Sequence, residues 1–159
     1  LKDAVERGIY LDNAHGFRNF NFEAAHRLLD QGIVPHCIST DAAIPQMRNP
    51  KGPVYSLTEC MSKGLAVGFS LADVIRMTTA NPAKALGIYH ETGSLEVGKV
   101  ADISLLEGVD GQWEFIDSLG TWFKGTRAIT PFLTIRAGDV VSPDYGPRPW
   151  GWLPKPGPG

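Results

Sequence analysis

The chain lacks the features that mark several large classes of protein. Its 159 residues include two cysteines, Cys37 and Cys60, which do not form a short paired motif. Neither a disulfide framework nor a thiolate zinc cage is therefore supported, and Cys37 is expected to pack in a strand. Basic clusters are absent, and the formal net charge is -2 with a pI near 6.1. Accordingly, we expect neither nucleic acid nor a membrane as a partner.

Long hydrophobic runs are also missing. No apolar run approaches the roughly 20 residues of a membrane-spanning helix. Residues 1–8 mix charged and apolar side chains, unlike a signal peptide. A cytoplasmic location is therefore expected. With 43% hydrophobic residues and no internal repeat, the composition is that of a globular protein with one domain or a domain plus an appendage.

Two short apolar runs each lead to a residue capable of chemistry, and one amphipathic helix separates them. Residues 9–12 are followed by His15, and residues 34–39 are followed by Asp41. A strand-helix-strand unit forms parallel neighbours through a right-handed crossover, so both side chains are expected at the same carboxyl-terminal edge of a sheet. Parallel α/β folds place their ligands at this edge. The pattern thus predicts an active-site rim.

Capping signals define the expected helices. Asn21 can cap the first turn of the helix between the two strands. Ser70 and Asp73 form an imperfect capping box. Asn81 is expected to cap a short helix with Pro82 at its first position. The full set of expected helices is residues 2–7, residues 21–32, residues 57–67, a helix starting at Ser70, and residues 81–87.

The pattern divides the chain into three parts. Residues 1–92 are α/β, with a surface loop at 43–53 directly after Asp41. Residues 93–141 form a small β region, because strand patterns alternate there with Gly and Asp turns. Its expected strands are residues 102–106, 113–116, 121–123 and 128–136. Residues 142–159 are rich in Pro and Gly and are expected to be extended or disordered, with Trp150 and Trp152 docking locally.

Three local patterns together point to one family. The first is LDNAHG at 11–16 with FNF at 20–22, and the second is ISTD at 38–41. The third and most specific is TANPAKALG at 79–87 followed by GSLEVGKVAD at 93–102. Together they resemble the amidohydrolase superfamily, specifically its dihydroorotase-like amidohydrolase and deacetylase metallohydrolases. GPVY at 52–55 and MSK at 61–63 resemble the deacetylase branch.

The resemblance implies a (β/α)8 TIM-type barrel of which this chain holds the last two βα units, followed by part of a small β-sandwich. The family binds one or two divalent metals, usually zinc, and hydrolyses amide or ester bonds of small molecules. Its His-x-His pair, its often carboxylated lysine and the histidines of its fifth and sixth strands have no counterpart in this sequence. We therefore expect a carboxyl-terminal portion that is inactive alone, because two strands cannot close a barrel.

The resemblance also assigns roles to individual residues. Asp41 is expected to be a metal ligand and the catalytic proton acceptor, although a strand-ending Asp is more often a cap or turn former. His15 is expected to bind substrate; the alternative is a histidine satisfied by a backbone carbonyl. Gly16 would allow close backbone approach to a ligand or permit a tight turn. Ala43 stands where relatives often carry histidine, and an alanine side chain has no polar atom to contact a substrate there.

Tyr55 and Arg48 follow Asp41 on the surface loop and its end. Either could meet a substrate carboxylate or carbonyl; the alternative is a solvated loop. We expect Tyr55 to bind substrate.

The favoured interpretation is a metal-dependent hydrolase acting on C–N bonds of small acylated molecules, deacetylase-like and present as an incomplete barrel. A small-molecule substrate and a homo-oligomer of the intact protein are the expected partners. Two alternatives stay open. One is a non-catalytic interaction module derived from the barrel, and the other is a cyclic amidohydrolase of the dihydroorotase or hydantoinase type.

Overall fold

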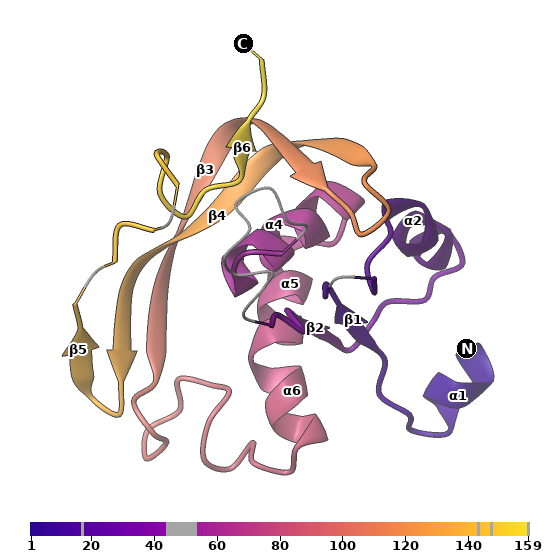
Figure 1. The fold of residues 1–159 in the computed structure, drawn as a ribbon. Helices are drawn as coiled ribbons and strands as arrows, with labels where there is room; N and C mark the ends of the chain where they lie inside the picture. The colour runs from indigo at the N-terminus through magenta and orange to yellow at the C-terminus, as the bar shows by residue number, and fades with distance from the viewer. Residues whose placement is uncertain (17, 44–53, 143, 147, 159) are drawn as a thin grey trace.

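The computed structural model describes residues 1–16, 18–43, 54–142, 144–146 and 148–158. After the short helix α1 (Lys2–Glu6), strand β1 (Asp12–Ala14), helix α2 (Phe22–Asp30) and strand β2 (Cys37–Ser39) form one unit (Figure 1). The two strands are parallel neighbours, with Asp12 opposite Cys37 and Ala14 opposite Ser39. The expected parallel pairing is therefore confirmed.

Both strands are shorter than the apolar runs that predicted them. Pro35 has no N–H to donate to a ladder, so β2 cannot extend through it. Next to it, the backbone N–H of Leu11 donates to the His36 side chain at Nδ1, 3.0 Å away. The ring of Tyr10 packs 5.0 Å from the His36 ring. These side-chain contacts add to backbone hydrogen bonds, because the N–H groups of His36 and Cys37 both donate to the Leu11 carbonyl, at 2.8 and 3.1 Å.

Side chains cap three helix starts, and two of these caps, Asn21 and Ser70, were expected. The side chain of Asn21 accepts a hydrogen bond from Ala24 N at the start of α2. Ser56 caps α4 (Leu57–Val67), and Ser70 caps α5 (Leu71–Thr78) by accepting from Asp73 N. α4 ends at Gly68, whose φ of 112° is a left-handed conformation that glycine adopts without strain.

The predicted cap at Asn81 is wrong. Helix α6 (Ala80–Ala85) begins after Thr79, which places Asn81 inside its first turn. The Asn81 side chain instead donates from Nδ2 to the His36 carbonyl at 2.9 Å. A tertiary partner has replaced the local cap, and this contact ties α6 to the segment before β2.

The four strands expected in the β region merge into two long ones. β3 (Ile103–Ile116) and β4 (Trp122–Arg136) form one antiparallel hairpin, and irregularities between Leu105 and Leu106 and between Asp110 and Trp113 let the pairing continue past Gly108 and Gly111. β5 (Asp139–Val141) pairs with β4, and β6 (Lys155–Pro156) pairs with β3.

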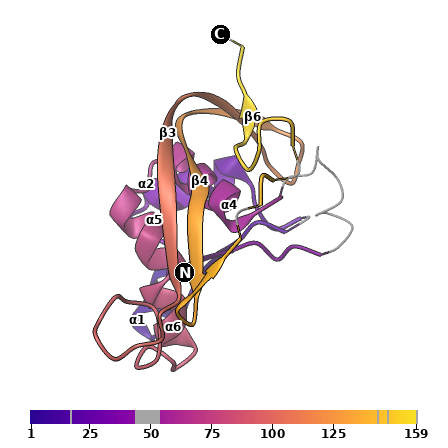
Figure 2. The ribbon, with the colours of Figure 1, turned by 90° about the vertical axis from the view of Figure 1, so that its left-hand side faces the viewer.

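Together these strands form one four-stranded sheet in the order β5-β4-β3-β6, and the hairpin lies along the helices (Figure 2). Its contact with them forms the core. Fully buried members of this core are Val74 and Met77 of α5, Phe115 of β3 and Ile129 of β4. In the part of the chain that the structure describes, this sheet packs on helices, and the expected β-sandwich portion at 93–141 stays a prediction.

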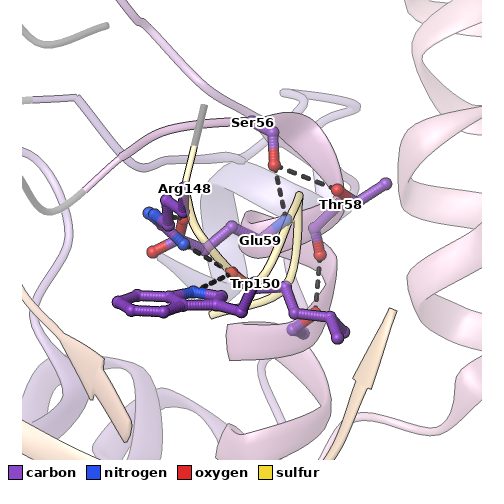
Figure 3. Close-up of polar contacts among 7 residues, drawn as sticks. Ser56, Thr58, Glu59, Arg148 and Trp150 are labelled. Carbon is purple, nitrogen blue, oxygen red and sulfur yellow. Dashed lines mark hydrogen bonds and ion pairs between the residues drawn. The ribbon is translucent and has the colours of Figure 1, made fainter. Parts of the chain in front are cut away.

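The described part of the tail is held by specific contacts and not disordered, and the expected local docking of two tryptophans is confirmed, since Trp150 and Trp152 donate to the carbonyls of Leu153 and Asp144. Arg148 Nη2 lies 2.7 Å from Glu59 Oε2 of α4, and the two side chains are 6% and 5% exposed (Figure 3). Arg148 and Trp150 both donate to the Leu153 carbonyl, at 2.7 and 2.9 Å. Pro154 is buried, and β6 follows it. A buried ion pair therefore anchors the described part of the tail to α4.

None of the helices in the described residues is both long enough and apolar enough to span a membrane.

Removing Arg148 is expected to cost about 3–5 kcal/mol in the free energy of unfolding, because Glu59 would remain buried without its partner. The test is urea unfolding of the intact protein carrying Arg148→Met. The control is Arg127→Met, which removes an ion pair to Asp110 whose side chains are 48% and 72% exposed and which should therefore matter little. Equal losses for both variants would contradict the anchoring role of Arg148.

Candidate functional site

The carboxyl ends of β1 and β2 bring three predicted residues together. The backbone N–H of His15 donates to the Ser39 carbonyl at 3.0 Å, which extends the pairing of the strands to this edge. Gly16 lies directly against the Asp41 side chain: a Cβ on Gly16 would stand only 2.8 Å from both Cβ and Cγ of Asp41. Glycine is therefore required here by close approach.

Asp41 is exposed and sits in a left-handed backbone conformation with φ 43°. Such conformations are uncommon for residues other than glycine and cluster at functional sites. Its Oδ2 accepts a hydrogen bond from Asn19 Nδ2 at 2.5 Å. Asn19 is brought there by a turn in which its N–H donates to the Gly16 carbonyl at 3.1 Å. The aspartate is thus oriented by a neighbouring loop.

Asn19 is a site residue that sequence reasoning missed. In the sequence, Asn19 was marked by nothing more than its position between the motifs LDNAHG at 11–16 and FNF at 20–22.

His15 is fully buried. Its ring stacks on the Phe20 ring, with centroids 4.1 Å apart and an interplanar angle of 25°. Neither ring nitrogen makes a hydrogen bond of normal geometry to a described residue. Burial and, second, the positive charge of Lys63 lower the pKa of His15 to about 3. The imidazole is therefore neutral at pH 7 and keeps one N–H donor and one acceptor lone pair.

Lys63 is the second residue that sequence reasoning did not single out. It projects from α4 into the core with no exposed surface, and its Nζ lies 5.7 Å from the Phe20 ring centroid. Burial lowers its pKa, while Glu59 acts in the opposite direction. Lys63 is the last residue of the MSK motif at 61–63. A lysine in a helix is usually exposed, so the sequence did not predict its burial.

Tyr55 contacts the tail of the chain. Its ring faces the Arg148 guanidinium, whose Cζ is 4.6 Å from the ring centroid. Arg48 falls outside the residues that the structure describes. The substrate-binding role of Tyr55 stays a prediction.

The described residues supply a partial metal site at most. Within the described ranges, His, Cys, Asp and Glu side chains do not gather in groups of three or more that could hold a metal ion. Asp41 fits the role of one oxygen ligand, because its carboxylate is exposed at the edge where ligands bind in parallel folds.

A cavity of about 750 Å³ lies elsewhere, between helices α4 to α6 and the hairpin, and its lining includes neither His15, Gly16 nor Asp41. The residue chemistry, rather than this cavity, therefore locates the candidate site.

A parallel strand-helix-strand unit with reactive side chains at its carboxyl edge is the arrangement of a barrel-type α/β enzyme. Residues 11–141 match the amidohydrolase family, and the chain belongs to that family.

A deacetylase from Brucella anthropi is 34% identical over 142 residues, which are 89% of this chain and 34% of that protein. A deacetylase from Enterococcus faecalis is 33% identical over 137 residues, 86% of this chain and 36% of that protein. The chain therefore spans about a third of the length of these curated relatives.

Two solved structures share the fold at similar identity. An adenine deaminase superimposes with a TM-score of 0.85 and 32% identity. The match covers 89% of this chain and 38% of the deaminase chain. A dihydroorotase superimposes with a TM-score of 0.77 and 30% identity. The match covers 89% of this chain and 37% of the dihydroorotase chain. The resemblance to the dihydroorotase-like amidohydrolases and deacetylases is confirmed, and a partial barrel fits these neighbours.

The lowered pKa of His15 predicts a pH dependence of stability. Between the ordinary pKa of 6.5 and the folded value of about 3, the unfolded chain binds a proton that the folded chain excludes. The free energy of unfolding should therefore fall as the pH drops through this window. Urea unfolding of the intact protein and of a His15→Phe variant, from about pH 7 to about pH 5, should show a flatter slope in the variant. Identical slopes, or an imidazole that titrates near 6.5 by NMR, would contradict the neutral buried state.

Proposed function

We propose that the chain is part of a metal-dependent hydrolase that cleaves the amide or ester bond of small acylated molecules, as a deacetylase does. The observation that carries this proposal is the meeting of Gly16, Asn19 and Asp41 at the carboxyl edge of β1 and β2. The two deacetylases, at 34% and 33% identity, support this class of reaction. Because the chain covers about a third of their length, the activity is assigned to the intact protein.

In this proposal the cofactor is one or two divalent metal ions, zinc as in the family, and Asp41 supplies one oxygen ligand. A bound metal ion lowers the pKa of its water toward about 7 and polarises the carbonyl that is attacked. The Asp41 carboxylate accepts the proton of the attacking water and returns it to the leaving amine or alcohol. The substrate contacts of His15 and Gly16 stay predictions, because His15 is buried against Phe20 and the space beside Gly16 holds the Asp41 side chain.

The dihydroorotase structure, with a TM-score of 0.77, favours a cyclic amide as the second candidate substrate. The chemistry is the same, and only the acyl group differs. A non-catalytic module derived from the barrel is the third candidate. We also propose a cytoplasmic location, a small-molecule partner and a homo-oligomeric intact protein.

Replacing Asp41 by Asn should lower hydrolysis by about 10²- to 10⁴-fold, because it removes the proton acceptor and a charged ligand oxygen. The intact protein is assayed with N-acetyl, O-acetyl and cyclic imide compounds, and its metal content is measured by mass spectrometry. The matched control is Asp30→Asn, an exposed carboxylate at the end of α2. A protein without metal and without hydrolysis of any of the three substrate types would favour the non-catalytic module.

The 159-residue chain alone should show no hydrolysis, because the other ligands that the family uses are not in its sequence. It is purified, supplied with zinc and assayed on the same panel beside the intact protein. Zinc-dependent turnover by the 159-residue chain would overturn this expectation.

A further inference from the structure

The turn that joins β3 to β4 lies against the segment that leads from His15 to α2. Ser118 donates to the Phe20 carbonyl twice, from its backbone N–H at 3.0 Å and from its Oγ at 2.5 Å. The two residues are 98 positions apart in the chain. The β hairpin therefore fixes the position of the Phe20 carbonyl.

Asp117 joins the same two segments through its side chain. The residue is 2% exposed. Its Oδ1 accepts from the backbone N–H groups of Leu119 and Thr121, both at 2.9 Å. Its Oδ2 faces the start of α2 and accepts from Asn21 Nδ2 at 3.1 Å and from Phe22 N at 3.3 Å. Oδ1 therefore stabilises the turn between β3 and β4, and Oδ2 holds the start of α2 against that turn.

The anchored segment carries the residues that contact the candidate site. The Phe20 ring stacks on His15, and the preceding residue, Asn19, donates to Asp41. Phe20 and Phe22 are 1% and 2% exposed, and their rings meet edge to face with centroids 4.8 Å apart. Close packing transmits a displacement instead of absorbing it. A shift of the Phe20 carbonyl therefore moves the Asn19 amide and the ring beneath His15 together.

We propose that Asp117 and Ser118 are positioning residues for the hydrolytic site. They hold residues 19–22 so that Asn19 meets Asp41 and Phe20 stacks on His15. This inference rests on the proposed function. Within the described residues, their side chains bond to Phe20, Asn21 and Phe22, so both act through the segment they anchor. A misplacement of about 1 Å at a reacting group can cost about 100-fold in rate, which makes such an anchor consequential.

A double-mutant cycle separates positioning from general stability. In the intact protein, Ser118→Ala should lower kcat by about 10-fold with KM changed less than about twofold. Because Ser118 acts through Asn19, the Ser118→Ala/Asn19→Ala double variant should be no slower than Asn19→Ala alone. Ser118→Thr keeps the hydroxyl and should restore kcat. Multiplicative effects, or an unchanged kcat in Ser118→Ala, would overturn the proposal.

The matched control is Asp110→Asn in the same hairpin. Its carboxylate forms an exposed ion pair with Arg127. It should leave kcat unchanged. Asp117→Asn keeps the size of the side chain, removes its charge and should act in the same direction as Ser118→Ala. An Asp110→Asn variant as slow as Ser118→Ala would overturn the proposal.

Hydrogen exchange provides a readout that does not depend on activity. Ser118→Ala should speed deuterium uptake in peptides covering residues 18–22 and leave α5 unchanged, whereas Asp110→Asn should change neither. If the intact protein hydrolyses none of the panel substrates, the proposed function fails while the exchange result still decides whether the turn anchors this segment. Equal uptake in residues 18–22 for Ser118→Ala and Asp110→Asn would overturn the anchoring.

Discussion

The close approach of Gly16 to Asp41 across the β1 and β2 pair is the constraint on which the candidate site depends. No Cβ fits at position 16, since it would stand 2.8 Å from two carbon atoms of the aspartate. The approach follows from the parallel pairing of the strands, which places both carboxyl ends at one edge. The left-handed backbone of Asp41 then turns its carboxylate toward Asn19. Strand pairing, a glycine and one hydrogen bond together build the arrangement.

The other elements of the described chain pack against the β1–β2 unit and hold this edge in place. Helices α4 and α5 pack between β2 and the β3–β4 hairpin and bury Lys63 close to Phe20. The hairpin returns to the edge at Asp117 and Ser118, where it meets the segment that carries Asn19. The tail is joined to α4 by the ion pair between Arg148 and Glu59. Segments far apart in the sequence therefore converge on the few residues that orient Asp41.

Local signals predicted much of this fold, because short-range physics decides those elements. The caps at Asn21, Ser56 and Ser70 act within three residues, and the bounds of α4 match the expected residues 57–67, although Ser56 itself was not singled out in the sequence. The capping prediction failed at Asn81, where a tertiary acceptor, the His36 carbonyl, outcompeted the local one.

Long-range contacts explain what the sequence alone could not predict. The meeting of His15 and Asp41 at one edge followed from the strand-helix-strand pattern, but the burial of His15 depends on Phe20 and Lys63, which periodicity does not bring together. The anchored tail and the continuous β3 and β4 depend on Arg148 meeting Glu59 and on bulged pairing, neither of which composition encodes.

The most direct test of Asp41 as a metal ligand is an anomalous difference map from crystals of the intact protein grown with zinc. The predicted result is a metal peak about 2.0–2.2 Å from a carboxylate oxygen of Asp41. A zinc peak whose ligands exclude Asp41, with the aspartate still turned toward Asn19, would contradict it.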